Sequence, residues 1–249
     1  LETLKDNADV TFDNASLEVS AGDVLENSSL RVHFNPRLGA SINSFYWKEK
    51  NFEFTAPKTI NRAGNLANCV IPARRLPGAF YNNNFTRKEI TKNSITYTNQ
   101  VTYGNYKGLT LTKKYTLNPN GVNVVATVVN NSNKEMALSW RTQNFINSDK
   151  GIWSWPTPDW ITIFAQTGAP LNGLNQIVHN IFRAKWQAKY FEKLNASLVI
   201  EASKSDVKQL YAWLSRFPGF STQEFYYREF TLPVKGSHTV EYNITLAKD

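Results

Sequence analysis

The most regular feature of the chain is a series of segments in its middle in which apolar and polar residues alternate. Alternation with a period of two residues is typical of a β-strand that buries one face. Residues that favour turns, namely Gly, Asn and Pro, separate the segments. Four segments follow this pattern: NSITYTNQVTY, LTLTKKYTL, VNVVATVV and MALSWRTQNFI. We therefore predict an antiparallel meander of long strands.

Strands are also predicted on both sides of the meander. SLRVHFNP predicts a strand that begins at Ser29, and RLGASINSFYWKEKNFEF predicts two strands around a turn, with Gly39 at the first corner. Towards the end of the sequence, EFYYREFTLPV and SHTVEYNITLA predict a closing strand pair. Residues 56–88 hold several prolines and glycines with little periodicity, which is typical of a long functional connection.

Two segments have the spacing of a helix. After Ser205, a candidate N-cap, apolar residues recur at i, i+3, i+4 and i+7, at Val207, Leu210, Tyr211 and Leu214. In residues 172–194 the first half also fits a helix, at Leu174, Ile177, Val178, Ile181 and Phe182. The following AKWQAKYF fits a strand as well as a helix.

The whole pattern predicts a mostly β protein. The chain has 249 residues, of which 41% are hydrophobic and 13% aromatic, enough to bury a large core. No repeat or linker divides it. We predict a single domain over residues 1–249, a large antiparallel β-sandwich (a supersandwich) with one or two short helices.

The charge of the chain narrows the class of partner. It carries 28 Lys and Arg against 20 Asp and Glu, a net charge of +8, which attracts polyanions. The basic residues are spread out, and the densest spots are only Arg74-Arg75 and Lys113-Lys114, so no segment resembles a nucleic-acid-binding arm. We expect an acidic oligosaccharide rather than nucleic acid, because the chain is rich in Trp, Tyr and Asn.

The sequence suggests no metal, cofactor or membrane span. Cys69 is the only cysteine, and the three histidines are far apart, so neither a disulfide nor a zinc site is expected. No apolar run approaches the roughly 20 residues that cross a membrane. Because the sequence begins at Leu1 rather than Met, we expect an exported protein, extracellular or periplasmic.

The segment GIWSWPTPDW concentrates three of the seven tryptophans, Trp153, Trp155 and Trp160. Trp153 and Trp155 are two residues apart, so on a strand they share a face. Indole rings stack on the apolar C–H face of a pyranose, which makes these residues candidate sugar contacts. The alternative is that they fill the edge of the core.

Several charged residues are further candidates. Arg74 and Arg75 could bind a carboxylate or sulfate as a fork, or form only a structural ion pair. Asp159 and Glu224 are candidate acid/base groups, because proton transfer at a sugar needs a carboxylate within reach. Glycoside hydrolysis needs two carboxylates at a set separation, and the sequence singles out no such pair. Exposed or capping acids are the alternative.

The order of the elements resembles the galactose mutarotase-like superfamily, which includes aldose 1-epimerases and sandwich domains of glycoside hydrolases. Three stretches, which cover most of the chain, are similar to the family's opening, central meander and closing strands: LRVHFNPRLGASINSFYWKEKNFEF, LTLTKKYTLNPNGVNVVATVVNNSNKEMALSWRTQNF and FTLPVKGSHTVEYNITL. The likeness lies in strand lengths and turns, so it implies a fold more than an activity.

The resemblance implies a sugar site on the concave face of a curved sheet. The strand from Met136 to Ile146 would cross that face, with Arg141 and Gln143 on one side of it and Trp140 on the other. An Arg is implied in the loop that holds Arg74 and Arg75. Aldose epimerases use a His acid and a Glu base, but SWRTQNFI has no His where the family has one, and Glu224 is only a loose match to the base.

Two functions of different classes follow. The first is a carbohydrate-binding or carbohydrate-active domain that recognises a sugar or acidic oligosaccharide through Arg74, Arg75, Arg141, Gln143, Trp153 and Trp155, with epimerase-like chemistry by Glu224 or Asp159 left open. The alternative is a non-catalytic β-sandwich interaction module of an extracellular or periplasmic assembly.

Overall fold

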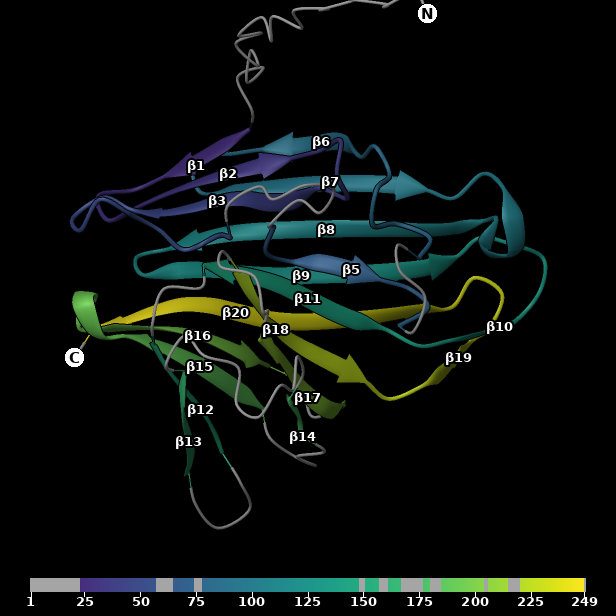
Figure 1. Ribbon diagram of the computed structural model, residues 1–249. Helices are drawn as coiled ribbons and strands as arrows, with labels where there is room; N and C mark the ends of the chain where they lie inside the picture. Colours follow the sequence, from purple (N-terminus) through teal and green to yellow (C-terminus); the bar gives the residue numbers. More distant parts are fainter. Residues whose placement is uncertain are drawn as a thin grey trace, which may run out of the picture.

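The meander of the sequence forms three neighbouring antiparallel strands in a computed structural model of the chain (Figure 1). The structure describes residues 23–56, 65–73, 78–147, 151–156, 161–166, 177–179, 185–203, 206–214 and 220–248. The meander belongs to a nine-stranded sheet, which runs in the spatial order β13 (Ile161–Gln166), β12 (Gly151–Pro156), β15 (Trp186–Phe191), β16 (Ala196–Ala202), β20 (Ser237–Lys248), β9 (Gly121–Asn130), β8 (Leu109–Asn118), β7 (Ser94–Gln100) and β6 (Thr86–Ile90).

A second layer lies against this sheet. It contains a five-stranded sheet in the order β14 (Ile177–His179), β17 (Val207–Leu214), β18 (Phe220–Tyr227), β11 (Arg141–Asn147) and β5 (Asn68–Val70). A four-stranded sheet continues it, with β1 (Val24–Glu26), β2 (Leu30–Asn35), β3 (Ser41–Trp47) and β4 (Phe52–Glu53). Isolated bridges between Ile42 and Leu66 and between Thr55 and Ile146 join the two sheets. The expected β-sandwich is confirmed.

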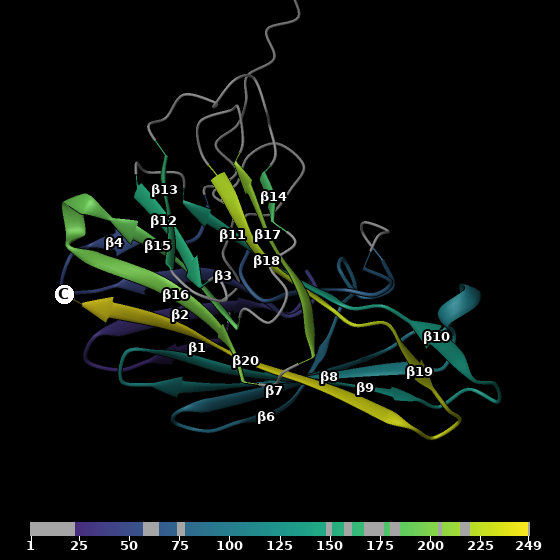
Figure 2. The ribbon, with the colours of Figure 1, turned by 90° about the horizontal axis from the view of Figure 1, so that it is seen from below.

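The nine-stranded sheet is curved, and the five-stranded sheet lies inside the curve. Figure 2 shows β16, β15, β12 and β13 rising on the same side as β11, β17 and β18. A hydrogen bond joins the layers here, because the Gln187 side chain on β15 donates to the Glu224 carbonyl on β18 at 3.1 Å.

The fourth predicted strand of the meander is not continuous. Residues 136–146 divide into β10 (Met136–Leu138) and β11, which leave the nine-stranded sheet, and β20 takes the place beside β9. β10 pairs with β19 (Phe230–Leu232), whereas β11 pairs with β18 and β5. The predicted pairing of the two closing segments is therefore wrong, because each finds its partner in a distant part of the chain.

The helix predicted over Val207–Leu214 is also wrong, because these residues form β17 in the middle of the five-stranded sheet. Residues 177–179 of the second predicted helix form β14, and AKWQAKYF contains β15. Two short 3₁₀ turns, η1 (Gly104–Tyr106) and η3 (Glu192–Leu194), are the helical elements among the described residues. Since longer helices are absent from that part, no apolar helix there could cross a membrane.

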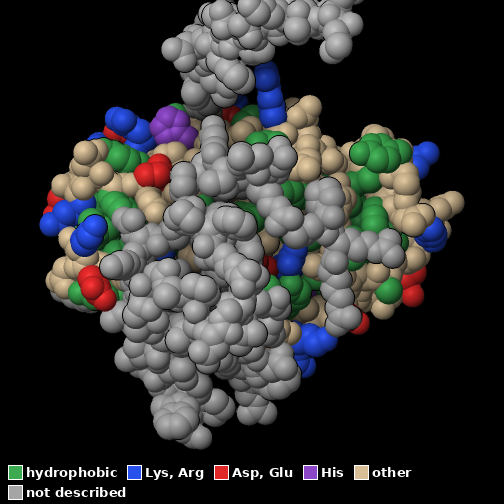
Figure 3. Space-filling model, viewed as in Figure 1, with side chains coloured by type: hydrophobic (Ala, Val, Ile, Leu, Met, Phe, Trp, Pro, Cys, Tyr) green, Lys and Arg blue, Asp and Glu red, His purple; other side chains and the backbone are tan. Residues whose placement is uncertain are grey.

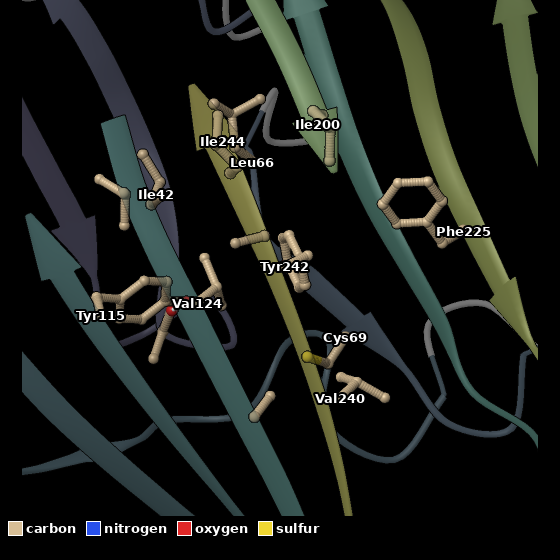
Figure 4. Packing of buried hydrophobic residues seen from close by; sticks show 14 of the residues in the cluster. Ile42, Leu66, Cys69, Tyr115, Val124, Ile200, Phe225, Val240, Tyr242 and Ile244 are labelled. Atoms are coloured by element: carbon tan, nitrogen blue, oxygen red, sulfur yellow. Dashed lines mark hydrogen bonds between the residues drawn. The ribbon is translucent and has the colours of Figure 1, made fainter. Parts of the chain in front are cut away.

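One hydrophobic core lies between the layers. Alternate residues of β20, among them Val240, Tyr242 and Ile244, are fully buried, as the period-two pattern predicts. Figure 4 shows them close to Leu66 and Cys69 of the second layer. The core cluster draws on residues from Leu25 to Leu246, so one set of packing contacts joins both layers.

The opposite face of the nine-stranded sheet is rich in hydroxyl groups. Five threonines stand directly opposite one another across five strands: Thr86, Thr98, Thr112, Thr127 and Thr239. Within this row, the Oγ1 atoms of Thr127 and Thr239 lie 2.8 Å apart. Threonine favours strands, and cross-strand threonine pairs stabilise antiparallel sheets. These properties explain why the polar positions of this face are occupied by threonine.

Candidate functional site

A cluster of polar side chains lies on the five-stranded sheet, where β11 and β18 pair. In this ladder Arg141 is opposite Tyr226, and Gln143 is opposite Glu224. Directly opposed residues project from the same face of a sheet, so these four side chains share one face. The residues between them belong to the other face, where Phe225 is in the core.

Glu224 is at the centre of this cluster. Its Oε1 accepts hydrogen bonds from Gln143 Nε2 at 3.0 Å and from Thr222 Oγ1 at 2.7 Å. Its Oε2 lies 3.3 Å from Arg141 Nη1. The same Nη1 donates to the Tyr226 hydroxyl at 2.7 Å, and the guanidinium lies over the Tyr226 ring. Arg141 thus connects a carboxylate to a phenol.

Burial controls the protonation of the cluster. Glu224 is 1% exposed, and this burial raises its pKa, while the Arg141 charge and the hydrogen bonds from Gln143 and Thr222 act in the opposite direction. Burial and the neighbouring Glu224 raise the pKa of Tyr211, which faces Glu224 from β17, to about 12. Carboxylates with raised pKa values beside a specific partner are candidates for proton transfer.

Three polar atoms of the cluster are buried and make no hydrogen bond to the described residues: Arg141 Nε, Gln143 Oε1 and Glu224 Oε2, the last of which has only its ion pair with Arg141. Such atoms are rare in folded proteins, because burying an unpaired polar group costs about 1–3 kcal/mol. Thr142 Oγ1 and both amide atoms of Gln223, on the opposite face of the same strands, are also buried without a hydrogen bond, so the unpaired atoms mark this face only together with the more accessible tyrosines beside them. Tyr211 and Tyr226, on the same face, are only half-buried.

A buried lysine fixes the sheet edge beside the cluster. Lys113 on β8 is completely buried, and its Nζ donates to the carbonyls of Gly39, Ala40 and Ala67 at 2.9, 3.0 and 2.7 Å. Ala67 immediately precedes β5, and its N–H donates to Asn144 Oδ1 at 2.8 Å. Lys113 and Asn144 therefore hold β5 beside Arg141 and Gln143.

Of the residues predicted for the site, the structure brings together Arg141, Gln143 and Glu224. Trp153 and Trp155 lie in β12, where Trp153 pairs with Lys189 of β15, but their side chains are outside the described residues. Arg74, Arg75, Trp160 and Asp159 are also outside that part of the chain.

Sequence reasoning missed Thr222, Tyr226 and Lys113. The alternation in STQEFYY carries the signal for the first two, because Thr222, Glu224 and Tyr226 are two residues apart and must share a face. The alternation in LTLTKKYTL places Lys113 on the apolar face with Leu111 and Tyr115, and Lys114 on the other face, but nothing in the sequence shows which groups would accept hydrogen bonds from a buried ammonium. No group of three potential metal ligands occurs in the part of the chain that the structure describes.

The fold has clear relatives among solved structures, although no protein-family profile matches the chain and no curated protein matches its sequence. A galactose mutarotase-like protein from Lactobacillus casei has a TM-score of 0.72 at 16% identity, over 90% of this chain and 99% of its own. The chain therefore has the galactose mutarotase-like fold. A galactose mutarotase related enzyme from Lactobacillus acidophilus reaches 0.71 at 14% identity, over 92% and 98%. A galactose mutarotase-like protein from Clostridium acetobutylicum reaches 0.64 at 14% identity, over 91% and 95%.

The galactose mutarotase-like fold was expected from the sequence, and the structure confirms it. The same likeness implied a His acid on the strand that carries Arg141, and β11 holds none. The residues that this chain presents instead are an arginine and an amide that each contact the same glutamate.

Proposed function

We propose that the protein binds a sugar on the face of the five-stranded sheet that carries Arg141, Gln143 and Glu224. The observation that supports this most directly is the set of unpaired polar atoms on that face, because a sugar hydroxyl both donates and accepts hydrogen bonds. Arg141 Nε can donate to a ligand acceptor and Gln143 Oε1 can accept from a ligand donor, while Glu224 Oε2 can accept a hydrogen bond in addition to its ion pair with Arg141. A hydroxyl-rich ligand supplies both.

The galactose mutarotase-like fold supports a sugar ligand as well, since two of the solved neighbours are described as galactose mutarotase-like and a third as a galactose mutarotase related enzyme. The extracellular or periplasmic location expected from the sequence remains a prediction. So do the contacts expected from Arg74, Arg75, Trp153 and Trp155.

A second, catalytic function is favoured by the position of Glu224 and Tyr226 on the same face of β18. They are two residues apart on one strand, which separates their Cα atoms by about 7 Å. A pyranose ring held between them would have a carboxylate on one side and a phenol on the other. We propose that Glu224 removes a proton from the anomeric hydroxyl and that Tyr226, held by Arg141, donates one to the ring oxygen. Proton transfer of this kind opens the ring and allows the anomers to exchange.

Calorimetric titration with a panel of neutral and uronic monosaccharides tests the binding proposal. Gln143→Met removes an amide from the site face, and we expect it to weaken binding roughly tenfold, as the loss of one or two hydrogen bonds does. Gln223→Met is the matched control, because Gln223 is an equally buried amide on the same sheet, in the adjacent position of β18. It should leave affinity unchanged.

If no sugar of the panel binds at millimolar concentration, the sugar-binding proposal is wrong and the interaction-module alternative gains support. The same holds if Gln223→Met weakens binding as much as Gln143→Met does.

A further inference from the structure

A second polar cleft lies away from the cluster around Glu224. Two connections enclose it: residues 100–108, which lead from β7 through η1 to β8, and residues 131–134, which lead from β9 towards β10. Its volume is about 650 Å³, within the range of small-molecule sites. Figures 1 and 2 both place η1 at one end of the molecule, away from β11 and β18.

The cleft has a positive charge that nothing in its lining balances. Lys107 and Lys134 line it, both exposed, and the lining contains no Asp or Glu. Neither lysine forms an ion pair with a residue in the described ranges. Two cations that face one polar recess favour an anionic ligand.

Apart from Val101 and two glycines, the remaining residues of the lining carry amide or hydroxyl side chains. Gln100, Asn105 and Asn133 make no side-chain hydrogen bond to other described residues, so their donors and acceptors are open to a ligand. Tyr103 lies between the lining residues Thr102 and Gly104 without lining the cleft itself, and it is 75% exposed, the largest exposure among the described bulky hydrophobic side chains. Exposed aromatic rings beside amides suit the C–H faces and hydroxyls of a sugar.

The base of the cleft is formed in advance. Asn131 N–H donates to the Gly108 carbonyl at 2.9 Å, and Gly108 N–H donates to the Val101 carbonyl at 2.9 Å, so the two connections are joined through their backbones. Gly108 has a φ of +94°, and a Cβ there would lie 2.8 Å from Ser132 N. A recess held by backbone contacts loses little freedom when a ligand binds.

We propose that this cleft binds a short acidic oligosaccharide, with Lys107 and Lys134 on its carboxylates and the amides of the lining on its hydroxyls. The site is separate from the one around Glu224 and does not depend on it. In this proposal the polyanion expected from the net charge of the chain binds at this cleft.

Amide NMR spectra of the full chain, titrated with an α-1,4-linked galacturonate trimer, test this proposal. The methyl-esterified trimer is the matched neutral probe, and inorganic sulfate is the probe for simple anion binding. We expect the acidic trimer to shift amides in 100–108 and 131–134, and the neutral trimer to bind more weakly. The double variant K107M/K134M should lose roughly three- to tenfold in affinity, as the removal of two exposed charge contacts does.

K88M/K92M is the matched control. It removes one exposed lysine in β6 and a second that follows β6, neither of which lines the cleft, so it should leave affinity unchanged. The proposal is overturned if the amides of the cleft do not shift, if K107M/K134M binds as wild type does, or if sulfate alone reproduces the shifts. Shifts confined to β11 and β18 would overturn this second site and support the first. Shifts confined to the cleft would support the second site alone.

Discussion

Two charged side chains, Glu224 and Lys113, determine most of what can be inferred about the site. Both are buried, and they are stabilised in different ways. Glu224 has a cationic neighbour, Arg141, and two neutral donors. Lys113 is held by three carbonyls, with the Tyr115 hydroxyl donating to one of them, that of Ala40. The surroundings of Glu224 are suited to proton transfer, whereas those of Lys113 are suited to connecting the two layers.

If Glu224 is the base, catalysis must depend on pH in a defined direction. The carboxylate is active only when ionised, so the rate of anomer exchange should rise with pH through the raised pKa of Glu224. Arg141 opposes that rise in pKa, so Arg141→Met should move the acidic limb of the profile to higher pH. Polarimetry of an aldose against pH measures this.

Glu224→Gln should lower the exchange rate by about a hundredfold or more, as the loss of a general base does. Glu201→Gln, at an exposed position of β16, is the control and should behave as wild type. An acidic limb that stays in place in Arg141→Met would contradict the assigned role of Glu224.

Lys113→Met tests this connection between the layers. The substitution removes the donor of three buried carbonyls, and we expect the free energy of unfolding to fall by about 2–4 kcal/mol at pH 7. Lys114→Met, on the opposite face of the same strand, should change it by less than about 0.5 kcal/mol. Urea unfolding of both variants measures the difference. Equal effects would show that the hydrogen bonds from Lys113 to the three carbonyls do not stabilise the fold.

The Lys113 ammonium also predicts a dependence of stability on pH. Burial lowers the pKa of Lys113 from 10.5 to about 8, below its value in the unfolded chain. Between these values the unfolded chain binds more protons, so the stability of the wild type relative to Lys113→Met should rise as pH increases from 8 to 10.5. Urea titrations of both proteins across this pH range measure the difference between their free energies of unfolding. A difference that stays constant would show that the ammonium does not titrate there.

At the level of elements, the loop between β2 and β3 connects the two layers through its backbone. Gly39 has a φ of +67°, and a Cβ at this position would lie 2.6 Å from the Tyr81 carbonyl oxygen. The neighbouring Ala40 also has a positive φ, and its carbonyl accepts from Lys113. The path of this loop therefore leaves no room for a larger residue.

Gly39→Ala and Gly104→Ala separate backbone strain from steric contact. Gly104 has a similar φ of +70°, but a Cβ added there would have no neighbouring side chain or backbone within 4 Å. Gly104→Ala should therefore lower the free energy of unfolding by only roughly 1–2 kcal/mol, which is the strain of an alanine in the left-handed conformation. Gly39→Ala should cost clearly more, because it also collides with backbone. Thermal or urea unfolding compares the two, and equal losses would contradict the close approach to Tyr81.

At the level of the molecule, the charged side chains are dispersed whereas the hydrophobic core is continuous. On the face drawn in Figure 3, the Lys and Arg side chains of the described residues are scattered rather than gathered in one area. The core, by contrast, is continuous from the first described strand to the last.

Because one core connects both layers, we expect unfolding in a single cooperative transition. Ile244→Ala, at a fully buried position of β20, should lower stability by about 2–5 kcal/mol and shift every probe equally. Far-UV and near-UV circular dichroism with tryptophan fluorescence measure this in urea. Separate midpoints for these probes would indicate two units instead of one.

Much of the fold could be predicted because strand formation leaves a local signal. The alternation in LTLTKKYTL and VNVVATVV specifies which face each residue occupies before any partner is known. The prediction failed at Val207–Leu214, where apolar residues at helical spacing also fit a strand buried within a sheet. Tertiary pairing with β14 and β18 decided the outcome there.

The sequence by itself determined a β-sandwich with a mutarotase-like order of elements, together with Arg141, Gln143 and Glu224 as candidates. Only the tertiary structure decided that these three meet, because Gln143 and Glu224 are far apart in the chain and become neighbours through the register of β11 and β18. It also decided how Lys113 is accommodated: alternation places this residue on the apolar face with Leu111 and Tyr115, and only the fold brings the carbonyls of Gly39, Ala40 and Ala67 to its Nζ.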